Sequence, residues 1–312
     1  MTKAKRIIVT VLAFATVRSL GAHVAEADAR IDFCQLTARA ALLSCMAGAR
    51  DDDFLASGKC FNVRDAAARD ACNQQASADA QDARQTCKDQ HGVRRAVCRR
   101  FGAAPYAPVV DPANFVATID NPLFPLVPGT TFVYEGQTAD GLEHDEFAVT
   151  HTTKVILGVT CVEVHDTLKV DGVLHEDTRD WFAQDLAGNV WYFGENTAVV
   201  DGGLPVDLAG SWMAGVDGAE PGIIMKASPA VGDFYRQEFL LGDAEDLAEV
   251  KSLTDAVTVP YGSFTQCLRT EESSSLEPGV LENKFYAAGV GNLLTVDLTT
   301  GERSELVQIT TE

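Results

Sequence analysis

Hydrophobic and polar residues follow two different patterns along the chain of 312 residues. Between residues 30 and 101, apolar residues such as Ile31, Cys34 and Ala41 recur at helical spacing. From about residue 115 onward, short stretches alternate between apolar and polar residues and are separated by turn residues, which is typical of strands. The patterns predict an α+β protein, with a helical module followed by an antiparallel β-sandwich or a partly closed β-barrel.

The first pattern predicts three helices, because the segment is rich in Ala, Arg and Gln and nearly free of β-branched runs. A loop at residues 51–53 and 57–58 is expected to end the first helix. The second helix is expected over about 62–75, where the side chain of Asn62 would cap it, and the third over about 78–100.

The beginning of the chain has the features of a secretory signal peptide. Lys3, Lys5 and Arg6 precede an apolar stretch at residues 7–17 that is too short to span a bilayer, and Ala27-Asp28-Ala29 fits a cleavage site. No later stretch is apolar for long enough to be a transmembrane segment. We therefore expect a periplasmic or secreted protein.

Six of the 8 cysteines lie in the helical segment, at intervals of 11, 15, 12, 15 and 11 residues. Residues 11 apart lie on nearly the same helix face, about 16 Å apart along the axis, so two antiparallel helices can be bridged twice. An exported chain with an even number of cysteines favours disulfides over a metal site. The favoured pairs are Cys34–Cys98, Cys45–Cys87 and Cys60–Cys72. The main alternative joins Cys45 to Cys60 and Cys34 to Cys72.

The second pattern predicts twelve strands. They are expected at residues 130–136, 143–153, 155–157, 160–170, 174–184, 190–194, 234–241, 248–259, 265–272, 281–287, 292–297 and 304–310. The Gly-rich residues 207–223 are expected to form a long loop, a candidate lid. Cys161 and Cys267 are the remaining cysteines, and we expect them to pair.

The charge divides the chain at the same place as the hydrophobic pattern. The formal net charge is −20, and Lys, Arg, Asp and Glu give +3 for residues 1–27, +2 for 28–102 and −25 for 103–312. So acidic a chain does not fit a general nucleic-acid binder, which needs basic surface. The expected organisation is a signal peptide at 1–29, a Cys-rich helical module at 30–101, a linker at 102–114 and an acidic antiparallel β-domain at 115–312.

Two charged clusters carry alternative interpretations. A basic cluster at the end of the third helix could stabilise this helix by placing positive charge at its C-terminus. It could instead dock on the acidic domain of the same chain, or bind an anionic membrane or glycan. It comprises Arg94, Arg95, Arg99 and Arg100. An acidic cluster is expected to be a solvated face or to protect an edge strand, with weak divalent cation binding as a minor hypothesis. It comprises Asp243, Glu245, Asp246 and Glu249.

Four phrases in the second segment resemble an exported bacterial β-domain family of uncharacterised function. They are Asn121-Pro-Leu-Phe-Pro-Leu-Val-Pro-Gly-Thr-Thr-Phe-Val-Tyr134, Asp180-Trp-Phe-Ala-Gln-Asp-Leu-Ala-Gly-Asn-Val-Trp-Tyr-Phe-Gly-Glu195, Val259-Pro-Tyr-Gly-Ser-Phe264 and Phe285-Tyr-Ala-Ala-Gly-Val-Gly291. The resemblance covers about residues 115–310 and excludes the Cys-rich helices. It implies an antiparallel β-domain in the bacterial envelope or medium, and it implies no catalytic residues.

A hairpin at Asp171-Gly172 supplies the candidate site. If this is a two-residue type I′ turn, opposite residues have numbers that sum to 343, and Asp166 lies opposite Asp177 on the more apolar, inward face. The same face of the neighbouring strand carries Asp145 and Phe147. The candidate ligand-binding residues are Asp166, His175, Asp177, Arg179, Trp181 and His151.

Three interpretations of this set remain open: an ion-pair network with Arg179 bridging Asp166 and Asp177, a polar ligand pocket, and a divalent metal site. The sequence contains none of the common catalytic signatures and indicates no cofactor. The sequence therefore favours an exported binding or envelope-associated protein, whose partner is an unidentified small molecule or envelope component. The alternative is a secreted hydrolase or metal-dependent enzyme that uses interior Asp and His residues, with Asp166, His175 and Asp177 as its first candidates.

Overall fold

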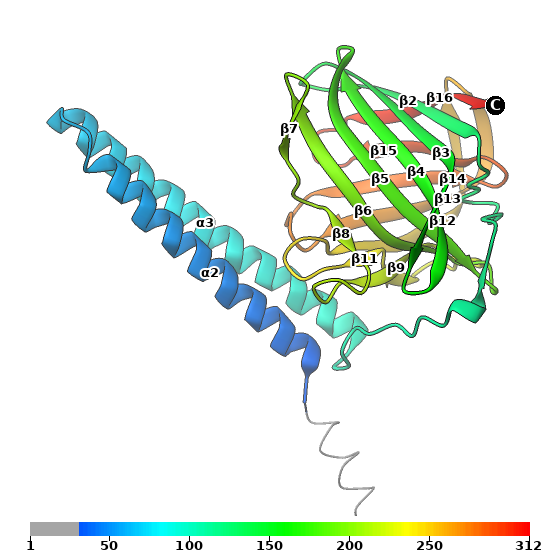
Figure 1. Cartoon of the computed structure of the whole chain (residues 1–312), viewed down its shortest axis with the longest axis horizontal. Helices are drawn as coiled ribbons and strands as arrows, with labels where there is room; N and C mark the ends of the chain where they lie inside the picture. Colours follow the sequence, from blue (N-terminus) through cyan, green and yellow to red (C-terminus); the bar gives the residue numbers. More distant parts are fainter. Residues whose placement is uncertain (1–30) are drawn as a thin grey trace, which may run out of the picture.

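A helical hairpin and an antiparallel β-barrel make up the computed structural model, which describes residues 31–312 (Figure 1). The predicted signal peptide at residues 1–29 lies outside the described residues. The hairpin projects from one side of the barrel, and only its base lies near the barrel (Figure 1). The α+β class and the order of helices before strands are as the hydrophobic pattern predicts.

The hairpin has two long helices, α2 (Phe33–Cys60) and α3 (Ala66–Phe101). Asp32 and Asp65 cap them, each accepting a hydrogen bond from a backbone N–H three residues later. The predicted loop at residues 51–53 and 57–58 and the predicted break near residue 76 are wrong, because α2 and α3 continue through them. Neither stretch contains proline, and the hairpin partner supports the first, where Asp53 forms an ion pair with Arg84.

Three disulfides hold α2 against α3. They join Cys34 to Cys98, Cys45 to Cys87, and Cys60 to Cys72. These are the pairs that the antiparallel packing argument favours. Because disulfides persist in oxidising compartments, the protein is a periplasmic or secreted one. Among the helices that the structure describes, none combines the length and the apolar character that a membrane crossing requires.

The β-barrel follows a short connecting segment. The connection contains the 3-10 helix η1 (Pro112–Asn114). The strands are β1 (Phe115–Val116), β2 (Thr130–Gln137), β3 (Leu142–Ile156), β4 (Val159–Val170), β5 (Val173–Asp185), β6 (Val190–Asp201), β7 (Leu204–Asp207), β8 (Trp212–Met213), β9 (Glu220–Met225), β10 (Phe234–Arg236), β11 (Glu238–Phe239), β12 (Asp246–Val259), β13 (Gly262–Ser274), β14 (Leu281–Ala287), β15 (Gly291–Asp297) and β16 (Arg303–Thr311).

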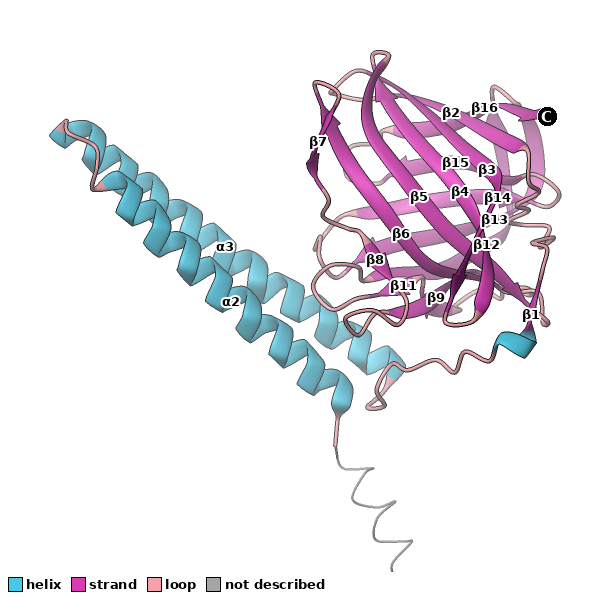
Figure 2. Ribbon diagram, viewed as in Figure 1, coloured by secondary structure: helices cyan, strands magenta, loops and turns pink. Residues whose placement is uncertain are grey.

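All paired strands are antiparallel, and the sheet curls until its ends approach each other. Strands β2 to β6 form one wall and β12 to β16 the other, and β16 pairs with β2 (Figure 2). The closing stretch is residues 234–239, in which β10 pairs with β12 while β11 pairs with β9. The predicted lid at residues 207–223 is not a free loop, because β8 and β9 within it pair with β6.

The base of α3 is fixed to the barrel by charge and aromatic contacts. Arg94 donates three hydrogen bonds of 2.7–3.0 Å to the Glu245 carboxylate, and both side chains are buried. Arg100 pairs with Glu249 and lies over the Phe234 ring, 3.8 Å from its centroid. Two of the four residues of the basic cluster, Arg94 and Arg100, thus dock on the acidic domain of the same chain. The expectation that the acidic cluster is only a solvated face is wrong, because Glu245 is buried.

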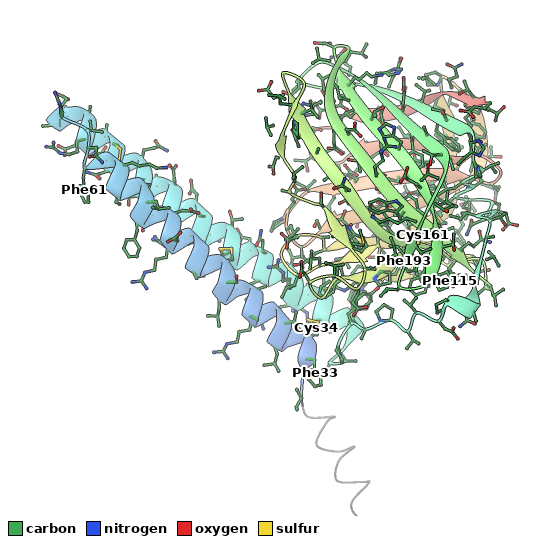
Figure 3. All side chains as sticks on the ribbon, in the orientation of Figure 1. Phe33, Cys34, Phe61, Phe115, Cys161 and Phe193 are labelled. Atoms are coloured by element: carbon green, nitrogen blue, oxygen red, sulfur yellow. A yellow bond between two sulfur atoms is a disulfide. The ribbon has the colours of Figure 1, made fainter. Side chains whose placement is uncertain are left out.

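The hairpin tip, in contrast, extends away from the barrel. Figure 3 shows Phe61 at the tip, with Phe33 and Cys34 at the base.

The predicted disulfide between Cys161 and Cys267 is absent: both are free, buried thiols. They belong to β4 and β13, which are not neighbours in the sheet, so the prediction placed two strands together that the barrel keeps apart.

Candidate functional site

The barrel encloses a cavity of about 360 Å³ between its two walls. Inward-facing residues of nearly every long strand line it, because side chains alternate between the interior and the exterior along each strand. The segment from Ile119 to Leu126 folds across one end: Ile119 and Leu126 form an isolated bridge and are both buried. Asn121 holds this segment by donating to the carbonyl of Gly188 and accepting from the N–H of Leu123.

One part of the cavity wall is aromatic. Phe124, Phe147 and Phe182 meet edge to face or tilted, with ring centroids 5.6–6.4 Å apart. Phe182 also stacks on Tyr192 at 4.7 Å. Such packing fixes the rings and leaves ring faces and edges as a rigid apolar surface.

The rest of the wall is strongly acidic. Eight carboxyl side chains line the cavity against one ammonium group, Lys284. The carboxyl groups are those of Asp145, Asp166, Glu176, Asp180, Glu195, Glu238, Asp246 and Glu272. Lys284 is already paired with Glu272 at 2.9 Å, and Glu272 also accepts from Thr270 and Tyr286. Within residues 31–312, the other seven carboxyl groups form no ion pair with a basic side chain.

Burial, assisted by repulsion between neighbouring charges, raises the pKa of six of these carboxyl groups: Asp145, Asp166, Asp180, Glu195, Glu238 and Asp246. Burial is the main cause that raises the pKa of Asp145, and the charge and hydrogen bond of Asp166 add to it. Burial likewise raises the pKa of Asp166 and, more strongly, that of Asp180. Because nearby carboxyl groups disfavour each other's charged form, Asp166 adds to the effect of burial in keeping the Asp145 carboxyl group protonated.

Tyr192 links the aromatic and the acidic parts. Its hydroxyl lies 2.5 Å from Asp180 and 2.9 Å from Glu195. The hydroxyl has one proton to donate, so the second contact requires a proton on a carboxyl group. Burial raises the pKa of Glu195 to about 7, which is consistent with such a proton.

Two buried polar atoms at the cavity have no hydrogen-bond partner in the part of the chain that the structure describes. The Gln237 amide nitrogen is unpaired although the residue is only 3% exposed, and so is Oδ1 of Asp145. Buried polar groups are nearly always satisfied, and leaving one unpaired costs on the order of 1–3 kcal/mol. The two groups therefore offer a donor and an acceptor to whatever occupies the cavity.

The structure brings only one of the six predicted ligand-binding residues, Asp166, to the cavity, together with Asp145 and Phe147 as the strand pattern indicates. The predicted turn is correct: Val170 pairs with Val173, and both turn residues have positive φ. A β-bulge on β5, where His175 has no partner opposite Leu168 and Lys169 of β4, then shifts the register by one residue, and Asp166 lies opposite Thr178. This shift reverses the two faces of β5.

The other five predicted residues lie elsewhere. His175 is exposed, Asp177 accepts from His165 on the outer face, and Arg179 lies 3.6 Å from Glu163. Arg179 therefore does not bridge Asp166 and Asp177.

Trp181 is buried, but it lies on the outer side of β5, where its indole donates to Glu163 and the Lys154 ammonium lies 3.5 Å from the ring centroid. The His151 side chain is 72% exposed beside Glu312, within a second register irregularity of β3 that lies between Val149 and Thr153.

The residues that take the predicted places are Glu176, Thr178, Asp180 and Phe182, one position along β5. These residues could have been identified from the sequence only if the bulge had been known, because both faces of β5 mix charged and aromatic residues. Cavity residues from distant strands, such as Glu238 and Glu272, carry no local signal. No group of three or more potential metal ligands with suitable geometry occurs among residues 31–312.

Comparisons with known proteins give little further guidance. No protein-family model matches the sequence, and no curated protein matches it. Among solved structures, one similar chain is described as an exported protein with a YmcC-like fold from Bacteroides fragilis (16% identity, TM-score 0.36, covering 61% of this chain and 99% of the other). Another is described as a lipoprotein from Parabacteroides distasonis (13% identity, TM-score 0.34, covering 60% and 98%).

Proposed function

We propose that this protein is an exported binding protein that holds a small organic molecule in the cavity of its β-barrel. The observation that carries the proposal is the unpaired Gln237 amide, buried at the cavity wall. The cavity volume of about 360 Å³ falls in the range of small-molecule sites, and the wall combines rigid aromatic rings with a few polar groups, as such sites do. In this proposal residues 115–312 are the binding domain, Asp166 is a ligand-binding residue, and the helical hairpin of residues 30–101 is a module for attachment or protection.

The enzymatic alternative has less support. It required His175 and Asp177 beside Asp166, and these two residues lie on the outer face of β5. The acid–base pair that a hydrolase of that design would use is therefore not assembled around Asp166.

Native mass spectrometry of the exported full chain tests the binding function. After incubation with a small-molecule extract of the bacterial envelope, we expect a bound mass that is lost on denaturation. Thr295→Trp should abolish it, because Thr295 lines the cavity. Thr310→Trp on the exposed face of β16 is the matched control and should retain it. A bare chain after incubation, or equal binding by folded Thr295→Trp, would refute the function.

A further inference from the structure

The cavity has a charge imbalance that an occupant would have to match. Among residues 31–312, seven of its eight carboxyl groups have no cationic partner, since Lys284 is held by Glu272. An anionic ligand would add to this repulsion, and a neutral ligand would leave it unchanged. Only a positively charged group would offset, by attraction, the free energy that burying these carboxylates costs.

Three of these groups lie on three successive strands, and we call them the aspartate trio: Asp145 of β3, Asp166 of β4 and Asp180 of β5. Neighbouring strands present them from one wall, and the pairings Asp166 with Thr178 and Val164 with Asp180 place two of them on adjacent inward positions. Oδ1 of Asp145 accepts no hydrogen bond. An ammonium or guanidinium group has several N–H donors and would satisfy such a cluster.

The aromatic wall adjoins the trio. Phe147 lies two residues after Asp145, and Phe182 lies two residues after Asp180, so each ring points inward beside a carboxyl group. A cation close to an aromatic face is attracted to the ring, and an apolar body attached to the cation would pack on the same rings. The unpaired Gln237 amide lies at the same cavity. Its nitrogen would donate to an oxygen of the ligand.

We propose that the ligand is an organic cation, an amine or guanidine attached to an apolar or aromatic body, whose charged end lies among Asp145, Asp166 and Asp180. This inference rests on the proposed binding function and adds the chemical class of the ligand. The surplus of negative charge in the β-domain, −25 over residues 103–312, favours the approach of the same class of molecule.

The bound cation replaces protons that the empty cavity retains. The trio is held partly protonated by burial, so a cation that pairs with the carboxylates displaces protons to solvent. Binding therefore tightens as the pH rises. The other titratable groups that face the trio are Tyr134, Glu176, Tyr192, Glu195 and Lys284, and His165 acts on Asp166 from the outer face of β4. Among them only His165 and Lys284 are basic, and each is paired with an acidic group, Asp177 and Glu272 respectively.

Calorimetric titration with three matched indoles tests the inference: tryptamine, a cation; tryptophol, its neutral counterpart; and indoleacetate, an anion. The full exported chain is used at pH 6 and pH 8, in two buffers of different ionisation enthalpy. We expect tryptamine to bind at least tenfold more tightly than tryptophol, and indoleacetate to bind more weakly than both. The tryptamine enthalpy should depend on the buffer, because protons are released, and its affinity should rise at pH 8.

Substitutions assign the charge to the trio. Asp180→Asn retains an acceptor for Tyr192 and should weaken tryptamine binding at least tenfold while changing tryptophol binding less than twofold. Asp145→Asn is a second variant with the same expectation if the first fails to fold. Asp177→Asn on the outer face of β5 is the matched control and should change neither.

The outcomes separate the two proposals. Equal or tighter binding of tryptophol would overturn the cation inference and leave the binding function standing. Binding of none of the three indoles, together with a bare chain in the native mass spectrum, would overturn both. A bound envelope molecule that is neutral or anionic would likewise refute the cation inference alone.

Discussion

The hairpin and the barrel reach stability by opposite means. The buried residues of α2 and α3 are mostly alanines and cysteines, such as Ala38, Ala41 and Ala76, and three disulfides join the helices. The barrel buries large side chains, among them Phe193 and Met225, and its two cysteines are free. Small side chains remove little apolar area from water, so the hairpin depends on cross-links where the barrel depends on its core.

Reduction of the disulfides should therefore unfold the hairpin and leave the barrel folded, and this is the largest expected effect. Each native disulfide contributes about 2–5 kcal/mol in small domains, so loss of all three should melt most of α2 and α3. We expect the far-ultraviolet helical signal to fall on addition of dithiothreitol. The near-ultraviolet aromatic signal should persist, because the tryptophans belong to the barrel.

A variant with Cys161→Ala and Cys267→Ala is the control for this experiment. Its helical signal should respond to reductant as that of the natural chain does, because neither thiol is bonded. Concurrent loss of both signals on reduction would show that the barrel does not stay folded without the hairpin. It would contradict the proposal that the two regions are stabilised by different means.

One of the contacts between the two regions is a buried ion pair, Arg94 with Glu245. Arg94→Ala leaves the Glu245 carboxylate, 1% exposed, without its partner, which typically costs about 3–5 kcal/mol. We expect a lower urea midpoint for the whole chain. A double variant, Arg94→Met with Glu245→Gln, removes both charges and keeps an acceptor for the N–H of Gly242; it should recover more than half of the loss. Failure to recover would indicate that Arg94 acts by packing instead of by charge.

Acidic side chains inside the barrel should reverse the usual dependence of stability on pH. The pKa of Glu195 is about 7 in the folded chain, above the ordinary value of 4.5. Between these values the folded chain holds a proton that the unfolded chain releases, so stability falls as the pH rises through this window. Glu195→Gln should raise stability at pH 8 by about 2 kcal/mol relative to pH 5, as measured by urea unfolding at both values.

The exposed Glu277 provides the control for the pH experiment. Glu277→Gln should leave the difference between pH 5 and pH 8 as it is in the natural chain. An unchanged difference in Glu195→Gln would assign the pH dependence to the other cavity carboxyl groups.

Sequence reasoning succeeded where spacing on a single element determines geometry. The interval of 11 residues between Cys34 and Cys45, repeated between Cys87 and Cys98, suffices to align two antiparallel helices, and the structure contains the corresponding pairs. Asp171-Gly172 likewise predicts its own turn, because both positions require positive φ.

Site prediction from sequence failed one step beyond the turn. The bulge opposite Leu168 and Lys169 adds one residue to β5. No residue type at this point of the sequence predicts a bulge. Every candidate on β5 consequently changed face, whereas Asp166, on the strand before the turn, kept its place. The pairing of Cys161 with Cys267 failed for a related reason: strand order over long sequence separations is a tertiary property.

The smallest effect should come from the second ion pair at the base of α3, six residues beyond the first. Arg100 is 41% exposed and pairs with Glu249, so solvent and salt screen the attraction. Its position over Phe234 adds a cation–π contact of similarly modest size. Arg100→Ala should therefore lower stability by less than about 1 kcal/mol, and the loss should shrink in high salt, as measured by urea unfolding. Arg94 and Arg100 share one helix and one kind of partner. Comparing the stability losses of the two alanine variants therefore shows how burial changes the contribution of an ion pair. A loss for Arg100→Ala as large as that for Arg94→Ala would mean that contact area, and not desolvation of the charges, fixes the hairpin to the barrel.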